Sequence, residues 1–257
     1  MLMDNDKLKA TTPEPIRRIA DCAYVINLDS RPDRWACMQD NLQSAGLEAE
    51  RFCAIGIGDL ADNPPPQALG DFLLRVDGPG PTFEHKLQAT WACMHSHLAV
   101  ISRARECGKA SVLILEDDCE FESYTKVVLR RVAAQLDDQK WDLLYLGGTL
   151  KKGSLRRRVS SNLRAVDRVR LAHAYVVSAS LYERILAEAP ASGLPLDWYY
   201  SEQLLPSVRA FMVEPMLARQ RLLDMSDIEQ VERKPKLKTR QRLRRWLAKL
   251  RYGELFN

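Results

Sequence analysis

The feature that most constrains the fold of this chain is a short apolar run that ends in three acids. Residues 111–115 read SVLIL, and Glu116, Asp117 and Asp118 follow directly. Such a run is typical of a strand that is covered on both faces, as in the sheets of α/β proteins. Because ligands of these sheets bind at the carboxyl ends of the strands, we expect the three acids at the ligand edge.

The rest of the chain alternates between strand-like and helix-like segments. Apolar runs predict further strands at 22–28, 50–54, 143–146, 163–168, 174–178 and 208–213. Helical spacing and stop signals predict helices at 32–45, 83–107, 123–136 and 180–189. This alternation indicates an α/β fold with a mixed, mostly parallel sheet flanked by helices. Residues 56–82 are rich in proline and glycine and are predicted to form a long loop.

The charge is distributed unevenly and suggests three regions. From Arg233 onward there are ten Lys or Arg and one acid, whereas residues 1–232 hold 28 bases and 33 acids. We therefore expect a flexible leader over 1–20, a mildly acidic folded domain over 21–230 and a basic tail over 231–257. An acidic body argues against nucleic acid as a partner.

The N-terminal segment and the cysteines point to a cytoplasmic protein. Residues 1–20 contain no apolar signal core, and no apolar run reaches the roughly 20 residues that cross a bilayer. The six cysteines include no C-x-x-C pair, so we expect reduced thiols.

The acids suggest a metal site. In an extended backbone Glu116 and Asp118 point to one side and Asp117 to the other. Two carboxylates on one side can share a divalent cation such as Mn²⁺ or Mg²⁺, which would neutralise a leaving diphosphate. The alternative is that Asp118 only caps the following helix.

Several segments resemble glycosyltransferase family 25, the family of lipooligosaccharide and collagen galactosyltransferases. They occur in the family's order and comprise YVINLDSRPDR (24–34), ACMHSHLAV (92–100), VLILEDDCEF (112–121), WDLLYLG (141–147) and HAYVVS (173–178). Pro195, Leu196 and Asp197 fit as well, as do Gln220, Ser226, Asp227 and Ile228 after Pro215. The resemblance spans about residues 22–230.

The resemblance implies a GT-A-like fold, a UDP-sugar donor such as UDP-galactose, and inversion at the anomeric carbon. The donor-binding residues that it implies are Asn27, Leu28, Arg31, Arg34, His97, Asp117 and His173. Arginines on a strand-to-helix turn suit phosphates, because they donate in pairs beside a helix N-terminus. The alternative for Arg31 and Arg34 is an exposed helix start with ion pairs to Asp29 or Asp33.

The histidines do not form an obvious metal pair. On a continuous helix His95 and His97 are about 200° apart, so they cannot bind one ion. His97 is expected near the donor or hydrogen-bonded in the core. His173 precedes a predicted buried strand, where it could reach the diphosphate or metal, or be a core histidine.

An inverting transfer requires a base that accepts the proton of the acceptor hydroxyl. Asp197 is the predicted base, in a segment whose aromatic residues Trp198, Tyr199 and Tyr200 could stack on sugar rings. Glu202 is the second candidate, and a helix N-cap is the alternative role of Asp197.

The basic tail has the pattern of a membrane-surface helix. Residues 233–252 combine many cations with Leu243, Trp246, Leu247 and Leu250 at helical spacing. The partners expected are thus a UDP-sugar, a glycan or lipid-linked glycan acceptor, and an anionic membrane surface on the inner face of the cell membrane. The alternative for the tail is a helix that packs on the body.

Two other functions compete with the transferase hypothesis. A nucleotidyltransferase also uses acids on an α/β sheet, but it usually has a glycine-rich phosphate loop, and the first turn here contains no glycine. A degenerate, non-catalytic transferase fold is the second, favoured by Ala89, Thr90, Trp91 and Ala92, which stand where the family usually has Gly-Glu-Ile-Gly.

Overall fold

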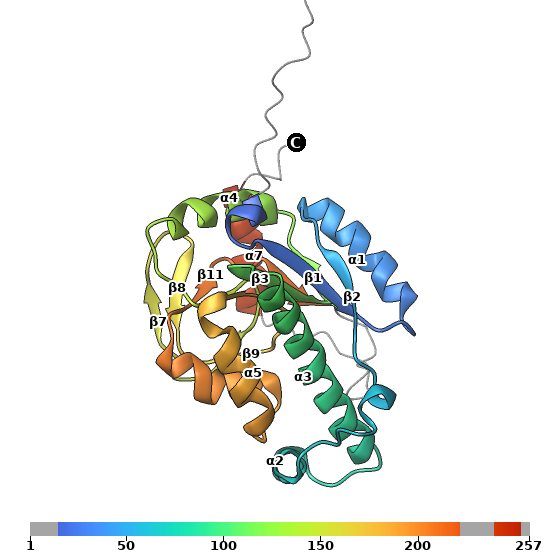
Figure 1. Cartoon of the computed structure of the whole chain (residues 1–257). Helices are drawn as coiled ribbons and strands as arrows, with labels where there is room; N and C mark the ends of the chain where they lie inside the picture. Colours follow the sequence, from blue (N-terminus) through green and yellow to red (C-terminus); the bar gives the residue numbers. More distant parts are fainter. Residues whose placement is uncertain (1–14, 222–238, 253–257) are drawn as a thin grey trace, which may run out of the picture.

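The computed structural model describes residues 15–221 and 239–252, which form a mixed α/β fold around one eight-stranded sheet (Figure 1). The strands lie in the order β2-β1-β3-β10-β5-β11-β8-β7. Their bounds are β1 (Cys22–Asn27), β2 (Glu50–Cys53), β3 (Ser111–Glu116), β5 (Leu143–Tyr145), β7 (Arg156–Arg158), β8 (Leu163–Val166), β10 (Ala174–Ser178) and β11 (Ala210–Val213). All run in one direction except β8 and β10, which confirms the mixed, mostly parallel sheet.

The strand β10 is inserted antiparallel between β3 and β5. After β5 the chain passes through β6 (Thr149–Leu150), β7, β8 and β9 (Val169–Arg170), and it returns to the edge where β3 ends. Strand β10 therefore starts at this edge and runs back through the sheet. As a result, His173, directly before β10, lies at the carboxyl ends of β3 and β5.

Helices cover both faces of the sheet. One face carries α2 (Gln67–Asp77), α3 (Phe83–Glu106), α5 (Tyr182–Ala191) and α6 (Leu196–Tyr199). The other carries η1 (Pro15–Arg18), α1 (Pro32–Ala45), α4 (Thr125–Leu136) and α7 (Thr239–Tyr252). Along β3, Val112 and Ile114 face the first layer, whereas Leu113 and Leu115 face the second. This alternation is the ordinary period of a strand, so the apolar run is explained by burial on both faces.

Helix α1 positions an arginine in the core. Pro32 stands in its first turn, and Gly46 ends it in the left-handed conformation at φ 63°. The buried residues of α1 include Arg34, Met38 and Leu42, which are spaced by four along the helix. Arg34 thus shares the inward face with apolar side chains, and its charge requires a partner there.

The prediction of a long loop over 56–82 was wrong. Helix α2 forms within it and buries Leu69, Phe72 and Leu73 against the core. The prolines at 64–66 precede the helix, where they are tolerated, and Gly78 directly follows it at φ 77°. Proline and glycine therefore mark the two ends of this helix, and the apolar spacing between them was the better signal.

The described residues include only part of the predicted leader and tail. Residues 15–20 pack on the body, with Ile16 and Ile19 only 2% and 3% exposed. Residues 1–14, 222–238 and 253–257, which include Ser226, Asp227 and Ile228, lie outside the described part. The boundaries of the three predicted regions remain predictions.

Two further observations concern the thiols and the helices. All six cysteines are free thiols, in agreement with the prediction. Within residues 15–221 and 239–252, no helix has the length and hydropathy that crossing a bilayer requires.

The packing at Gly147 predicts a large effect of a single methyl group. A Cβ at this position would lie 2.1 Å from the carbonyl oxygen of Ala218 and 2.7 Å from Nε2 of His173. We expect Gly147→Ala to lower the free energy of unfolding by about 1–3 kcal/mol, measured by urea denaturation. Gly58→Ala is the matched control, because nothing lies within 4 Å of its Cβ, and should change stability by less than about 0.5 kcal/mol. Equal urea midpoints for Gly147→Ala and Gly58→Ala would contradict the close packing around Gly147.

Candidate active site

The three acids lie at the edge where several strands meet. Glu116 is the last residue of β3 and is paired with Ile26 of β1. Its backbone N–H donates to the carbonyl of His173 at 2.9 Å, which connects it to the start of β10. The backbone turns after Glu116, and β4 (Cys119–Phe121) begins three residues later. The predicted position at the ligand edge of the sheet is therefore observed.

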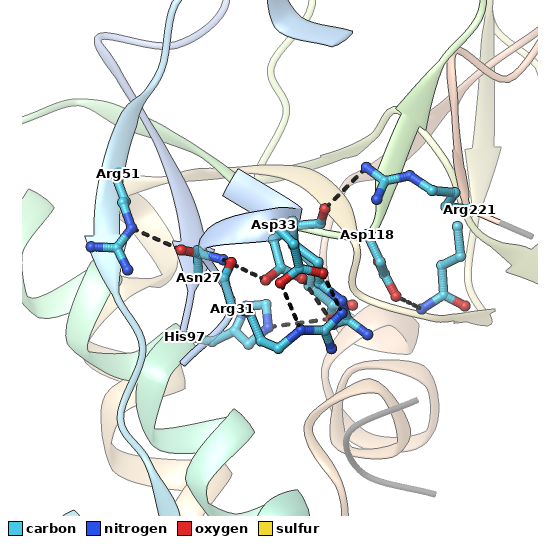
Figure 2. A network of polar contacts seen from close by, with 11 residues as sticks. Asn27, Arg31, Asp33, Arg51, His97, Asp118 and Arg221 are labelled. Atoms are coloured by element: carbon cyan, nitrogen blue, oxygen red, sulfur yellow. Dashed lines mark hydrogen bonds and ion pairs between the residues drawn. The ribbon is translucent and has the colours of Figure 1, made fainter. Parts of the chain in front are cut away.

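Asp117 is buried and is bound by two residues predicted to bind the donor. Asn27 Nδ2 donates to its Oδ2 at 2.7 Å, and Arg34 Nη1 donates to Oδ1 at 3.1 Å. Asp117 is 7% exposed, and burial raises its pKa while Asn27 and Arg34 oppose that shift. Asn27 also donates to the carbonyl of Arg31 and accepts from Arg51, so its amide joins β1, β2 and the turn before α1 (Figure 2).

Leu28 and Arg31 lie on the turn between β1 and α1. The carbonyl of Leu28 accepts the N–H of Arg31 at 2.9 Å. The guanidinium of Arg31 binds Asp33 at 2.9 Å and lowers the pKa of that carboxyl to about 2 (Figure 2). The ion pair with Asp33 matches the alternative reading of Arg31, whereas Arg34 turns inward to Asp117.

His97 connects Glu116 to a buried pair of tyrosines. Its Nε2 lies 3.5 Å from Oε1 of Glu116, and its Nδ1 lies 2.9 Å from the hydroxyl of Tyr175. That hydroxyl is in turn 3.3 Å from the hydroxyl of Tyr200. His97 is 1% exposed, so it is both a core histidine and a neighbour of the acidic site. His95 points elsewhere, to Trp91 and Asn63, as the helical spacing predicts.

Asp118 contacts a separate two-stranded ribbon rather than the helix that follows it in the chain. Strand β4 pairs with β12 (Ala218–Gln220) to form a two-stranded ribbon. Gln220 Nε2 reaches Oδ2 of Asp118 at 3.5 Å, and the backbone N–H of Arg221 donates to the carbonyl of Asp118 at 2.6 Å. The guanidinium of Arg221 reaches the carbonyl of Asp117 at 3.5 Å (Figure 2). Helix α4 begins at Thr125 with Tyr124 at its N-cap, so the alternative role of Asp118 as the cap of this helix does not hold.

Asp197 is recessed and is held by an unusual backbone turn. Its Oδ2 accepts the N–H of Leu171 at 3.2 Å, and Leu171 adopts φ 71°. A leucine in this conformation costs about 1–2 kcal/mol, which the surrounding structure must offset. Burial raises the pKa of Asp197, while the Leu171 N–H and the positive charge of Arg170 oppose the shift. The helix N-cap is Pro195, so capping does not explain Asp197.

Glu202 lies beside Arg170, and two of the neighbouring aromatic residues differ from what the sequence suggested. Glu202 binds Arg170 Nη2 at 3.1 Å, and the guanidinium carbon of Arg170 lies 3.0 Å from the ring centroid of Trp198. Tyr199 and Tyr200 are fully buried. The expectation that these two rings stack on a sugar was therefore wrong, because they fill the core under α6 and the π-helix η4 (Tyr200–Leu204).

Cys93 is influenced both by the three acids after β3 and by Asp197. The pKa of its thiol is raised well above the usual value, first by burial. The negative charges that raise it further are those of Glu116, Asp197, Asp118 and Asp117. The charge of Glu116 also raises the pKa of Asp197. The charges of the predicted metal ligands and of the predicted base therefore act on the same buried thiol.

One group of residues in the described part of the chain has the spacing of metal ligands. The Sγ of Cys93, a ring nitrogen of His97 and a carboxylate oxygen of Glu116 all lie within 4.8 Å of one another. Cys93 and His97 are four apart on α3 and therefore lie on one side of it.

His173 lies beside this site but is enclosed. It is 1% exposed, and Gly147 leaves the space for its ring. No described contact settles whether it would touch a diphosphate, so its predicted role stays a prediction.

Sequence reasoning missed three residues of the site. Cys93 could have been found from its spacing to His97. Arg170 and Tyr175 gave no local signal, because each gains its role from partners more than 20 residues away in sequence.

Comparison with known proteins addresses the family. The profile described as "Glycosyltransferase family 25 (LPS biosynthesis protein)" matches residues 20–186. The chain belongs to glycosyltransferase family 25. The match includes β1, α1, α3, β3 and β10, and therefore the acids and most of the residues around them.

The relatives of this family 25 chain include a protein named as a galactosyltransferase and proteins named as inactive. A "Glycosyltransferase 25 family member" of Aedes aegypti is 32% identical over 186 residues, which are 68% of this chain and 30% of that protein. "Procollagen galactosyltransferase 1" of Danio rerio is 26% identical over 77% of this chain and 36% of its own length. A "Probable inactive glycosyltransferase 25 family member 3" of Bos taurus is 28% identical over the same shares. The chain spans about a third of the length of these relatives.

One solved structure is similar to this family 25 chain only loosely. It is a glycosyltransferase involved in the glycosylation of the major capsid of PBCV-1, at 11% identity and a TM-score of 0.38. It covers 81% of this chain and 97% of its own. A likeness of this size assigns no role to any residue.

The buried ion pair predicts a specific stability loss. Arg34→Met leaves the carboxylate of Asp117 in the core without its cation, which we expect to lower the free energy of unfolding by about 3–5 kcal/mol at pH 7. The pKa of Asp117 is already raised by burial and rises further without Arg34, so the loss should shrink as the pH falls and the carboxyl is protonated. The measurement is urea denaturation across pH.

The control for that experiment is an exposed pair of the same residue types. Arg18 binds Asp137 at 2.6 Å, and both side chains are about half exposed. Arg18→Met should change stability by less than about 1 kcal/mol and without comparable pH dependence. A similar loss in the free energy of unfolding in both variants would show that the Arg34–Asp117 pair contributes no more to stability than an exposed ion pair.

Proposed function

We propose that this chain is an inverting glycosyltransferase that moves a hexose, galactose in the first instance, from a UDP-sugar to a glycan acceptor. The observation that carries the proposal is that a chain of family 25 places Glu116 at the end of β3 and keeps Asp197 as a recessed carboxylate that accepts the N–H of Leu171. A recessed carboxylate with a raised pKa is a stronger base than an exposed one. It can therefore accept the proton of an acceptor hydroxyl as the bond to the donor breaks.

The residues at the strand ends fit a hard divalent cation. Glu116 is partly exposed and Asp118 supplies a second carboxylate, and oxygen ligands suit Mn²⁺ and Mg²⁺. Cys93 is a poor ligand for such an ion, because its soft sulfur suits metals such as Zn²⁺ or Cu⁺ better than Mn²⁺ or Mg²⁺. We propose that Glu116 and Asp118 hold the cation, which when bound would neutralise charge on the diphosphate.

The other residues have supporting roles in this proposal. His97 and Tyr175 orient Glu116, and Asn27 and Arg34 hold Asp117 beside it. Leu28, Arg31 and His173 border the edge at which a nucleotide would bind. The acceptor would be a surface glycan such as lipooligosaccharide, and the protein would be cytoplasmic and peripheral on the inner face of the cell membrane.

A second candidate is a non-catalytic protein that has kept the donor site. Two relatives, from Bos taurus and Homo sapiens, are named as inactive or probably inactive members of the family. Such a protein would bind a nucleotide sugar and show no transfer.

A donor screen tests the reaction class. We expect one UDP-sugar to raise the melting temperature only when Mn²⁺ or Mg²⁺ is present, and transfer to acceptor to occur with the same donor. Glu116→Gln should abolish the metal-dependent part of the shift. Stabilisation without transfer to any acceptor would favour the binding protein, and no response to any nucleotide sugar would contradict both.

Removing the base tests the role of Asp197. Asp197→Asn should lower turnover by about 100-fold or more and leave donor binding near normal, because the amide cannot accept the proton. Glu202→Gln, measured in parallel, tests the second candidate base. Wild-type turnover in the Asp197 variant would remove this residue from the role.

The pH dependence of kcat/KM tests the electrostatics of the base. Arg170 favours the ionised form of Asp197, so removing its charge raises the pKa of that carboxyl. We expect Arg170→Gln to move the acidic limb of the profile to higher pH, because activity requires the carboxylate. Arg170→Lys keeps the charge and should move it less. An unshifted limb in both variants would indicate that another group is the base.

A further inference from the structure

The C-terminal helix α7 is fixed to the body by one of its faces. Ala248 and Tyr252 are each 6% exposed and belong to the core under α1 and α4. The hydroxyl of Tyr252 accepts from Nδ2 of Asn162 at 2.9 Å, and Arg245 Nε lies 2.7 Å from the carboxylate of Glu122. The helix therefore packs on the body, as one reading of the tail predicted.

The opposite face of α7 is apolar and exposed. Leu243, Trp246, Leu247 and Leu250 are 55%, 54%, 50% and 38% exposed. At about 100° per residue these four fall within one stripe about 100° wide, and its centre lies about 180° from the face that packs on the body. Packing on the body therefore does not explain why these positions are apolar.

Cations border the apolar stripe on both sides. Arg244 and Arg251 lie about 90–110° to one side of its centre, and Arg242 and Lys249 lie about 90–110° to the other. The three arginines are exposed, and the sequence of α7 contains no acid. An apolar stripe between two cationic edges is the arrangement of a helix that lies in a bilayer interface with anionic headgroups.

We propose that this outer face of α7, defined by Leu243, Trp246, Leu247 and Leu250 with the four cations beside them, docks on an anionic lipid bilayer. The combination of charged and apolar side chains favours an anionic bilayer over the other partners. In a symmetric contact with a second copy, cationic edges would face cationic edges, which is repulsive. Nucleic acid would match the cations but would leave the four apolar side chains in water.

Helix α7 is joined to the acidic site through a side-chain contact with the residue that follows β4. Glu122, which binds Arg245, directly follows β4, and β4 begins directly after Asp118. The ribbon partner β12 supplies Gln220 to Asp118. The helix is thus anchored to the same ribbon that carries one of the site's acids. The docking itself does not depend on the transferase activity, so either can fail alone.

Vesicle binding by the purified full chain tests the proposal. We expect co-sedimentation with vesicles of phosphatidylcholine that contain about 30% phosphatidylglycerol, and at least tenfold weaker binding to pure phosphatidylcholine. Leu243→Ser with Leu247→Ser should weaken binding at least tenfold, and so should Arg244→Glu with Arg251→Glu. Far-UV circular dichroism verifies that each variant is folded.

The matched control reverses two exposed arginines on another element. Arg156→Glu with Arg157→Glu on β7 changes the net charge equally and should leave binding within about twofold. Brominated lipid should quench part of the tryptophan fluorescence of the wild-type chain. The Trp246→Phe variant should lack this quenched part, because Trp246 is the residue that contacts the lipid. Equal losses in the β7 and α7 charge variants, no quenching at Trp246, or failure of the wild-type chain to bind anionic vesicles would each overturn the proposal.

Discussion

The structure depends on a buried negative charge at the end of the central strand. Asp117 follows a strand that is covered on both faces, so its carboxylate can be ionised there only if it is paired. Asn27 from β1 and Arg34 from α1 supply the pairing. The interaction fastens the first strand and the first helix to β3. It lies at the point where the backbone turns after β3, between Glu116, which contacts His97, and Asp118, which contacts Gln220.

The acidic site combines two distant parts of the chain. Glu116, Asp117 and Asp118 come from the first half, whereas Arg170, Leu171 and Asp197 come from the second, and the insertion of β10 between β3 and β5 joins them. Burial is the main cause that raises the pKa of the Cys93 thiol and of Asp197, and the negative charge of Glu116 raises both further. The proposed cation ligands and the proposed base come from these two parts of the chain.

The C-terminal helix gives the molecule a second functional surface. Its inner face is anchored by Tyr252 and by the Arg245–Glu122 pair, and its outer face presents apolar side chains between cations. The two readings of the tail, packing on the body and contact with a membrane, are therefore compatible, because they concern opposite sides of one helix.

The sequence by itself determined the α/β class, the limits of α1 and α4, and the place of the acids at the strand ends. These features follow from local signals, namely apolar periodicity, proline and glycine at helix ends, and charge after an apolar run. Only the tertiary structure decided the reversed direction of β10, the helix between the prolines at 64–66 and Gly78, and the enclosure of Tyr199 and Tyr200. It also decided that Arg34 binds Asp117 and that Cys93 lies among carboxylates. Strand pairing and the burial of charge depend on contacts between residues far apart in the chain, and no local pattern encodes them.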